Sequence, residues 1–144
     1  MKSNLNELDD WQKEAKKTFE GDYWYESPPD TLASSNDLLK NLKVVLLIGN
    51  NTASAAEDFL IAAESIALGQ TVGENTFGST GQPMFMRLPG GGSARICTKR
   101  DMYPDGKEFV GYGIKPDIVV EASIQDFIAG TDKAMEVAIK TLQF

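Results

Sequence analysis

The feature that most constrains the fold is a continuous apolar run at residues 43–49, which reads Lys-Val-Val-Leu-Leu-Ile-Gly. Such a run, closed by glycine, is typical of a parallel strand that is buried on both faces. A helical pattern follows over residues 53–68, Gly69 ends it, and residues 70–73 form a second strand candidate. Strand, helix and strand in this order predict a right-handed crossover in a parallel sheet. The apolar face of the helix is expected to contain Phe59, Leu60, Ala63, Ile66 and Ala67.

The second half of the chain has a different pattern. Residues 84–88 and 94–98 flank Pro89-Gly90-Gly91-Gly92, which predicts a β-hairpin. Residues 118–120, Ile-Val-Val, form a further short strand candidate. A final helix is expected to begin at Thr131 or Asp132 and to run through Leu142. These elements together predict a mixed α/β fold.

The first 42 residues form a segment that leads into the main domain, which we expect over residues 43–144. Residues 6–19 are polar and helix-capable, with a thin apolar stripe. The aromatic patch Tyr23-Trp24-Tyr25 then precedes a proline-rich turn. This patch fits either a cap on the hydrophobic core or one wall of a substrate cleft.

Composition excludes several classes of function. A length of 144 residues suits one domain with a single core. The net charge of -7 argues against nucleic-acid and anionic-membrane partners, which require a basic face. The first residues do not resemble a signal peptide, and we expect no membrane span. Cys97 is the single cysteine, so no internal disulfide can form, and its alternating neighbours predict a half-buried position in a strand.

The chain contains no histidine. A Ser-His-Asp triad, a Cys-His pair or a histidine-ligated zinc site therefore cannot be assembled from these residues alone. The sequence predicts neither a metal site nor a cofactor. Any enzymatic interpretation has to place the proton acceptor elsewhere.

Ser54 lies where the buried strand passes into the helix. The unpaired N–H groups and positive dipole end of a helix favour negative charge at this point. A nucleophilic serine benefits from such a place because its attack on a carbonyl develops an oxyanion, and the N–H of Ala55 is the natural first donor. The same residues allow a structural interpretation, since Ser54-Ala55-Ala56-Glu57 is a capping box that begins a helix. Spacing alone favours the cap.

Several motifs in a fixed order favour the nucleophile over the helix cap. The run VVLLIGNNTASAAEDFLIAA, then VGENTFG, then LPGGGSARICTKRDMYPDGKEFVGYGIKPDIVV, resembles the tail-specific (C-terminal-processing) serine peptidases and their tricorn-like relatives. The resemblance covers roughly residues 40–142. It implies the layered α/β spiral of crotonases and ClpP-type peptidases, with β-hairpins in the second half. It also implies that Ser54 is a nucleophile whose following N–H, that of Ala55, contributes to the oxyanion hole.

The function implied is hydrolysis of polypeptides inside their chains, through an acyl-enzyme on Ser54. The family resemblance also implies a periplasmic or otherwise extracytoplasmic location. Gly78 and Ser79, within the second motif, are candidate substrate-binding residues. The sequence does not predict the oligomeric state.

One departure from the family pattern concerns the general base. Tail-specific members carry a lysine in F-G-K-G, whereas this chain has Ser79 at the matching position. The tricorn-like branch takes its base from an upstream histidine, which would precede residue 1, as would a glycine-rich oxyanion segment. We therefore expect this chain to be an incomplete and inactive part of a histidine-dependent enzyme. Lys99 is a less favoured replacement for the base.

Two alternatives remain open at this stage. The chain is a non-catalytic α/β binding or scaffold domain if Ser54 is only a helix cap. A crotonase-type acyl-CoA enzyme is a weaker third possibility, and it would need paired oxyanion amides but no serine nucleophile. Substitution of Ser54 by alanine separates these interpretations.

Overall fold

The computed structural model describes residues 41–143. These residues fall into two compact units, one made of residues 41–80 and 101–143 and the other of residues 81–100, and each is considered by itself. The helix expected over residues 6–19 and the aromatic patch at residues 23–25 lie outside the described residues.

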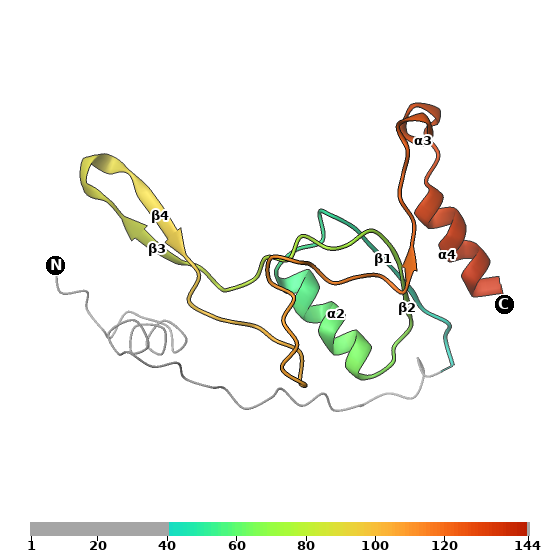
Figure 1. Ribbon diagram of the computed structural model, residues 1–144, viewed down its shortest axis with the longest axis horizontal. Helices are drawn as coiled ribbons and strands as arrows, with labels where there is room; N and C mark the ends of the chain where they lie inside the picture. The colour runs from blue at the N-terminus through green and yellow to red at the C-terminus, as the bar shows by residue number, and fades with distance from the viewer. Residues whose placement is uncertain (1–40, 144) are drawn as a thin grey trace. The chain divides into compact units, whose positions relative to one another are not determined.

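A three-stranded parallel sheet forms the centre of the larger unit (Figure 1). Its strands are β1 (Val45–Ile48), β2 (Gln70–Gly73) and β5 (Ile118–Val119), in the order β1-β2-β5. Helix α2 (Ala55–Ser65) connects β1 to β2, and Ile48 of β1 lies beside Gly73 of β2. The predicted strand–helix–strand unit in a parallel sheet, and with it the α/β class, is confirmed.

The expectation that the first strand is buried on both faces is wrong. β1 is an edge strand of the described sheet, and the side chain of Leu47 is exposed while Ile48 is buried. The central position belongs to β2, where Val72 is fully buried. An apolar run indicates that a strand is hydrophobic, but it does not indicate where the strand lies in the sheet. The pattern therefore could not distinguish an edge strand from a central one.

The buried face of α2 is narrower than the sequence pattern indicated. Leu60 and Ala63 are buried as expected, whereas Phe59 and Ile66 are more than half exposed. Ala67 lies beyond the end of the helix. Successive helical residues point about 100° apart, so only one stripe of α2 can face the core.

The core lies between α2, the end of β1 and the irregular segment 101–114. Tyr103 and Phe109 pack edge to face, with ring centroids 6.2 Å apart, and both rings are buried. Burial raises the pKa of Tyr103, and the nearby carboxylate of Glu64 raises it further. Each large apolar side chain buried here contributes about 1.5–3 kcal/mol. The core residues are Ile48, Leu60, Tyr103, Phe109 and Ile114.

Two helices end the described chain, α3 (Ile124–Ala129) and α4 (Lys133–Gln143). Helix α4 packs against β1 and β2. The carboxylate of Asp132 accepts a hydrogen bond of 2.9 Å from the N–H of Met135, so Asp132 is the cap of the two candidates considered. Helix α3 was not expected from the sequence pattern. No helix within residues 41–143 combines the length and apolarity that a bilayer crossing requires.

The smaller unit is the expected hairpin, with β3 (Met84–Arg87) antiparallel to β4 (Ser93–Ile96). A short 3-10 turn, η3 (Pro89–Gly91), joins the two strands. The hairpin predicted in the second half of the chain is confirmed.

The placement of Cys97 in a half-buried strand is wrong, because β4 ends at Ile96 and Cys97 is exposed. The backbone N–H groups of Thr98 and Lys99 both donate to the carbonyl oxygen of Gly81, which takes this segment out of the strand ladder. A Cβ atom at Gly81 would lie 2.7 Å from the Cβ of Cys97, so this close approach requires glycine.

Candidate active site

Ser54 has an unusual backbone conformation at the start of α2, with φ 58° and ψ -123°. Positive φ is uncommon for a residue with a Cβ, and such strain gathers at functional sites. The serine is exposed, as are Ala55 and Ala56 behind it. The reciprocal placement of a capping box is present at Ser54 and Glu57, but the Ser54 hydroxyl makes no side-chain capping hydrogen bond. The turn between β1 and α2 therefore presents the Ser54 hydroxyl to solvent at the amino end of the helix.

Glu57, one turn into α2, is fully buried and accepts four hydrogen bonds. Its Oε2 accepts from the N–H of Ser54 and from the N–H of Ser79, both at 3.0 Å. Its Oε1 accepts from the N–H of Gly78 at 2.7 Å and from the hydroxyl of Thr76 at 2.5 Å. These donors, together with the helix amino end, compensate a buried carboxylate that would otherwise be costly.

The loop over residues 76–79 is thereby held against the start of α2. The N–H of Ser54 also donates to the carbonyl oxygen of Ser79 at 2.8 Å, and the N–H of Phe77 donates to the carbonyl oxygen of Thr52 at 2.9 Å. The structure thus brings Gly78 and Ser79 next to Ser54. Their N–H groups point at Glu57 and are committed to it, while the side chain of Ser79 is exposed. A substrate-binding role for this pair stays a prediction.

A third segment supports the loop from the other side. The hydroxyl of Thr76 accepts from the N–H of Ile114 at 2.7 Å, which links Glu57 to the segment before β5 through one buried threonine. Gly78 and Gly113 permit this contact, because a Cβ at Gly78 would lie 2.5 Å from the backbone nitrogen of Gly113. Both glycines have positive φ, so a side chain at either position would strain the backbone as well.

Two exposed aromatic residues border these loops. Phe77 is 65% exposed and Tyr112 is 76% exposed, and the N–H of Gly111 donates to the carbonyl oxygen of Gly78 at 2.8 Å. Sequence reasoning did not single out either aromatic residue. Each immediately precedes a glycine that the close packing of the loops requires. An aromatic residue followed by such a glycine was the sequence signal that could have identified them. Large exposed apolar groups beside a concentration of polar groups are typical of binding surfaces.

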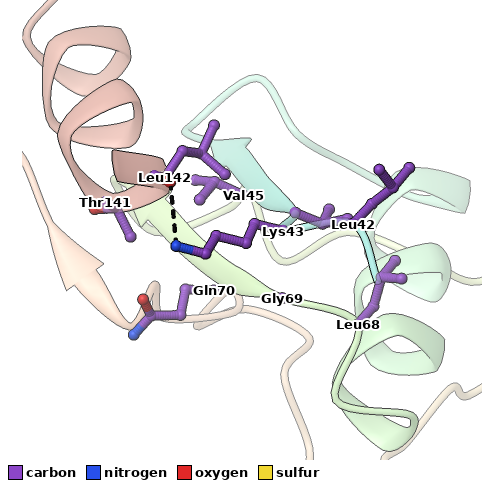
Figure 2. Close-up of a pocket in the computed structure, with 9 residues that line it drawn as sticks. Leu42, Lys43, Val45, Leu68, Gly69, Gln70, Thr141 and Leu142 are labelled. Atoms are coloured by element: carbon purple, nitrogen blue, oxygen red, sulfur yellow. Dashed lines mark hydrogen bonds between the residues drawn. The ribbon is translucent and has the colours of Figure 1, made fainter. Parts of the chain in front are cut away.

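The opposite end of the sheet holds a pocket of about 270 Å³ (Figure 2). It is lined by the starts of β1 and β2 and by the end of α4, where the ammonium of Lys43 donates to the carbonyl oxygen of Leu142 at 3.5 Å. Asp117 also lies at this end, and its carboxylate accepts from the N–H of Thr71 at 2.8 Å. Ligands of open α/β sheets bind at the carboxyl ends of strands, where Ser54 lies, so this pocket is separate from the candidate site.

No side chain within the described unit supplies an evident general base to Ser54. Ser79 stands at the position that a lysine occupies in the tail-specific pattern, and the chain has no histidine. Lys99 belongs to the hairpin unit. Among residues 41–143, no group of histidine, cysteine, aspartate and glutamate side chains is arranged to hold a metal ion.

Relatives of this chain are peptidases by name. The chain is 30% identical over 100 residues to a carboxy-terminal-processing protease of Bartonella bacilliformis, a match that covers 69% of this chain and 23% of the relative. It is 28% identical over 95 residues to a probable CtpA-like serine protease of Staphylococcus aureus, covering 64% of this chain and 19% of that protein. The chain therefore spans about a quarter or less of the length of these curated relatives.

Solved structures show the same fold. A putative peptidase from Parabacteroides merdae has a TM-score of 0.61 and 28% identity, with 69% of this chain and 31% of that chain covered. The tricorn protease has a TM-score of 0.63 at 23% identity, covering 69% of this chain and 10% of that chain. The model of peptidase family S41 matches residues 5–120, most of the sequence. The chain belongs to peptidase family S41.

Proposed function

We propose that this chain carries the nucleophile of a serine endopeptidase, and that Ser54 attacks the scissile carbonyl of a polypeptide to form an acyl-enzyme. The observation that carries the proposal is the exposed, positive-φ conformation of Ser54 at the amino end of α2, where its N–H donates to the buried carboxylate of Glu57. Strain of this kind persists only where the surroundings hold it, and here Glu57 and Ser79 both accept from the Ser54 N–H.

The backbone N–H of Ala55 is the proposed oxyanion donor. It is one of the N–H groups at the start of α2 that lack a helical partner, and no hydrogen bond within residues 41–143 engages it. The helix dipole adds a favourable potential for the negative oxygen. A donor of this type is worth roughly 3–4 kcal/mol of transition-state stabilisation in serine peptidases.

The general base is proposed to be a histidine from a region upstream of this sequence. A serine at position 79 cannot take the proton from Ser54 as a lysine would. Each carboxylate oxygen of Glu57 accepts two hydrogen bonds, one of the four from the Ser54 N–H and the other three from the loop at residues 76–79, so Glu57 acts as a positioning residue that holds the Ser54 turn. We accordingly expect the chain alone to be inactive and the longer protein to be active.

The rival interpretation makes the chain a scaffold domain in which Ser54 only caps α2. The geometry gives this interpretation less support, since the Ser54 hydroxyl makes no capping hydrogen bond. The polypeptide substrate and the extracytoplasmic location are parts of the same proposal. Fractionation of cells that express the longest natural form would test the location.

The test is covalent labelling of the longest natural form with a fluorophosphonate probe, followed by peptide mass mapping. We expect the label on Ser54, its complete loss in Ser54→Ala, and its retention in Ser123→Ala. Ser123 is a matched control because it also begins a helix with an acidic residue three positions later. A folded full-length protein that takes no label, or a label that survives in Ser54→Ala, would contradict the proposal.

A further inference from the structure

Charge is segregated sharply between the hairpin and the rest of the chain. Residues 81–100 contain four basic residues and no acidic residue. The other residues contain ten basic and twenty-one acidic side chains. A positive hairpin on an otherwise acidic protein attracts anions to one place, since charge patterning creates local potentials that net charge conceals. The basic residues are Arg87, Arg95, Lys99 and Arg100.

Two of these arginines share one face of the hairpin with an aromatic ring. Phe85 lies opposite Arg95, and Arg87 lies opposite Ser93, so all four side chains project from the same side of the two strands. Arg87 and Arg95 are exposed, and Phe85 is 58% exposed. Within residues 41–143, neither an ion pair nor a side-chain hydrogen bond engages Arg87 or Arg95. We call Phe85, Arg87, Ser93 and Arg95 the arginine face.

The two residues that flank the hairpin in the sequence both belong to the larger unit. The hydroxyl of Thr80, the residue before the hairpin, donates to the carboxylate of Asp101, the residue after it, at 2.6 Å. Thr80 directly follows Ser79, whose carbonyl oxygen accepts from the N–H of Ser54. The hairpin is therefore joined in sequence to the loop that contacts Ser54.

We infer that the arginine face binds an extended acidic segment of the polypeptide substrate, an inference that rests on the proposed function. The described hairpin has two strands, each with one edge that lacks a partner there, and an extended peptide can add to such an edge through main-chain hydrogen bonds. Every second side chain of that peptide would then lie on the arginine face. Carboxylates at alternate positions would meet the two guanidinium groups, which pair well with carboxylates.

An acidic polypeptide fits these observations better than a nucleic acid. A nucleic acid carries a dense run of phosphates and gains affinity only by neutralising many of them, whereas the remainder of this chain would repel such a polyanion. A short acidic segment needs only the two arginines and the apolar ring of Phe85. Because only every second side chain of an extended peptide lies on the arginine face, the inference requires acidic residues at alternate positions of the ligand. This spacing can be tested.

The experiment measures binding to the full chain by fluorescence anisotropy, with three labelled peptides of equal length. In the first peptide every second residue is glutamate, the second has the same composition with its glutamates in one block, and the third replaces glutamate by glutamine. We expect the alternating peptide to bind tightest and the glutamine peptide weakest. Equal affinity for the alternating and blocked peptides would overturn the inference, as would tighter binding of a single-stranded oligonucleotide of equal charge.

Variants locate the binding surface. We expect Arg87→Gln with Arg95→Gln to weaken the alternating peptide about tenfold at low salt, a magnitude set by two exposed charge pairs. The control, Lys115→Gln with Lys140→Gln, makes the same change in net charge on the larger unit and should leave affinity unchanged. Equal weakening in both double variants would overturn the inference. Circular dichroism of each variant checks that the fold is retained.

The same proteins separate this inference from the proposed function. If the fluorophosphonate probe labels Ser54 but the chain does not bind the alternating peptide selectively, the inference about the arginine face is contradicted and the peptidase proposal is not. If the longest natural form binds the alternating peptide selectively but Ser54 takes no label, the proposed role of Ser54 as a nucleophile is contradicted. The hairpin is then an acidic-peptide binding element. In the active protein, the arginine variant should raise KM for acidic substrates with little change in kcat.

Discussion

Two helices of this chain begin with the same sequence pattern, a serine followed three residues later by a carboxylate. At the start of α3, Ser123 has an ordinary extended conformation, and its hydroxyl accepts from the N–H of Asp126 at 3.2 Å. At the start of α2, Ser54 has positive φ and its hydroxyl makes no capping bond. Asp126 is partly exposed, whereas Glu57 is fully buried.

The difference shows that one local pattern serves two purposes. In α3 the serine and the carboxylate satisfy each other's backbone donors, and the carboxylate of Asp126 also lies 3.6 Å from the ammonium of Lys133. In α2 the carboxylate turns inward to collect donors from the loop at residues 76–79, and the serine hydroxyl is left facing solvent. The two helix starts therefore differ in what the serine hydroxyl contacts, although the sequence pattern is the same.

The largest expected difference in stability concerns the two carboxylates. Glu57→Ala should lower the free energy of unfolding of the full chain by about 3–5 kcal/mol, because four donors lose a buried charged partner. Asp126→Ala should cost much less, since its partners can turn to water. Urea denaturation followed by circular dichroism measures both values. Similar losses in the two variants would remove the distinction between the sites.

For the two serines we expect the opposite result, with the larger loss of stability at the start of α3 and smaller losses than for the carboxylates. Ser123→Ala should lower the free energy of unfolding by about 1 kcal/mol, the usual value of a helix cap. Ser54→Ala should change it by less than about 0.5 kcal/mol, because no capping hydrogen bond is lost. Urea denaturation followed by circular dichroism measures the free energy of unfolding of both serine variants. A larger loss in Ser54→Ala would favour the scaffold interpretation.

The smallest effect concerns pH at the start of α3. The hydroxyl of Ser123 donates to the carboxylate of Asp126 at 2.6 Å, and this hydrogen bond, with a second from the Ser123 N–H, lowers the pKa of Asp126. A pKa that is lower in the folded state contributes stability above the unfolded value of about 3.9, and this stability is lost as pH falls through the folded value. In Ser123→Ala, NMR titration should find the Asp126 pKa closer to the unfolded value. An unchanged pKa would mean that Lys133 controls it.

Much of the fold follows from local patterns. The apolar run, the helix after it and the short second strand predicted the parallel crossover, and the glycine-rich turn predicted the hairpin. Helix α3 escaped notice because it is only six residues long, although Ser123 and Gly130 mark both of its ends. Burial was predicted less well, as Leu47, Phe59 and Cys97 show. Hydrophobicity states what a side chain would gain from burial and not whether a neighbour covers it.

What the sequence determined by itself was the order of the elements and the place of Ser54 between a strand and a helix, since periodicity and capping residues act over a few positions. Only the tertiary structure decided that Glu57 turns inward to Thr76, Gly78 and Ser79, and that the hydroxyl of Ser54 does not cap α2. The physical reason is that a buried carboxylate takes whichever donors surround it, and those donors come from residues about twenty positions away. No local pattern encodes such a meeting, because it exists only once β2 has paired with β1 and carried the following loop to the start of α2.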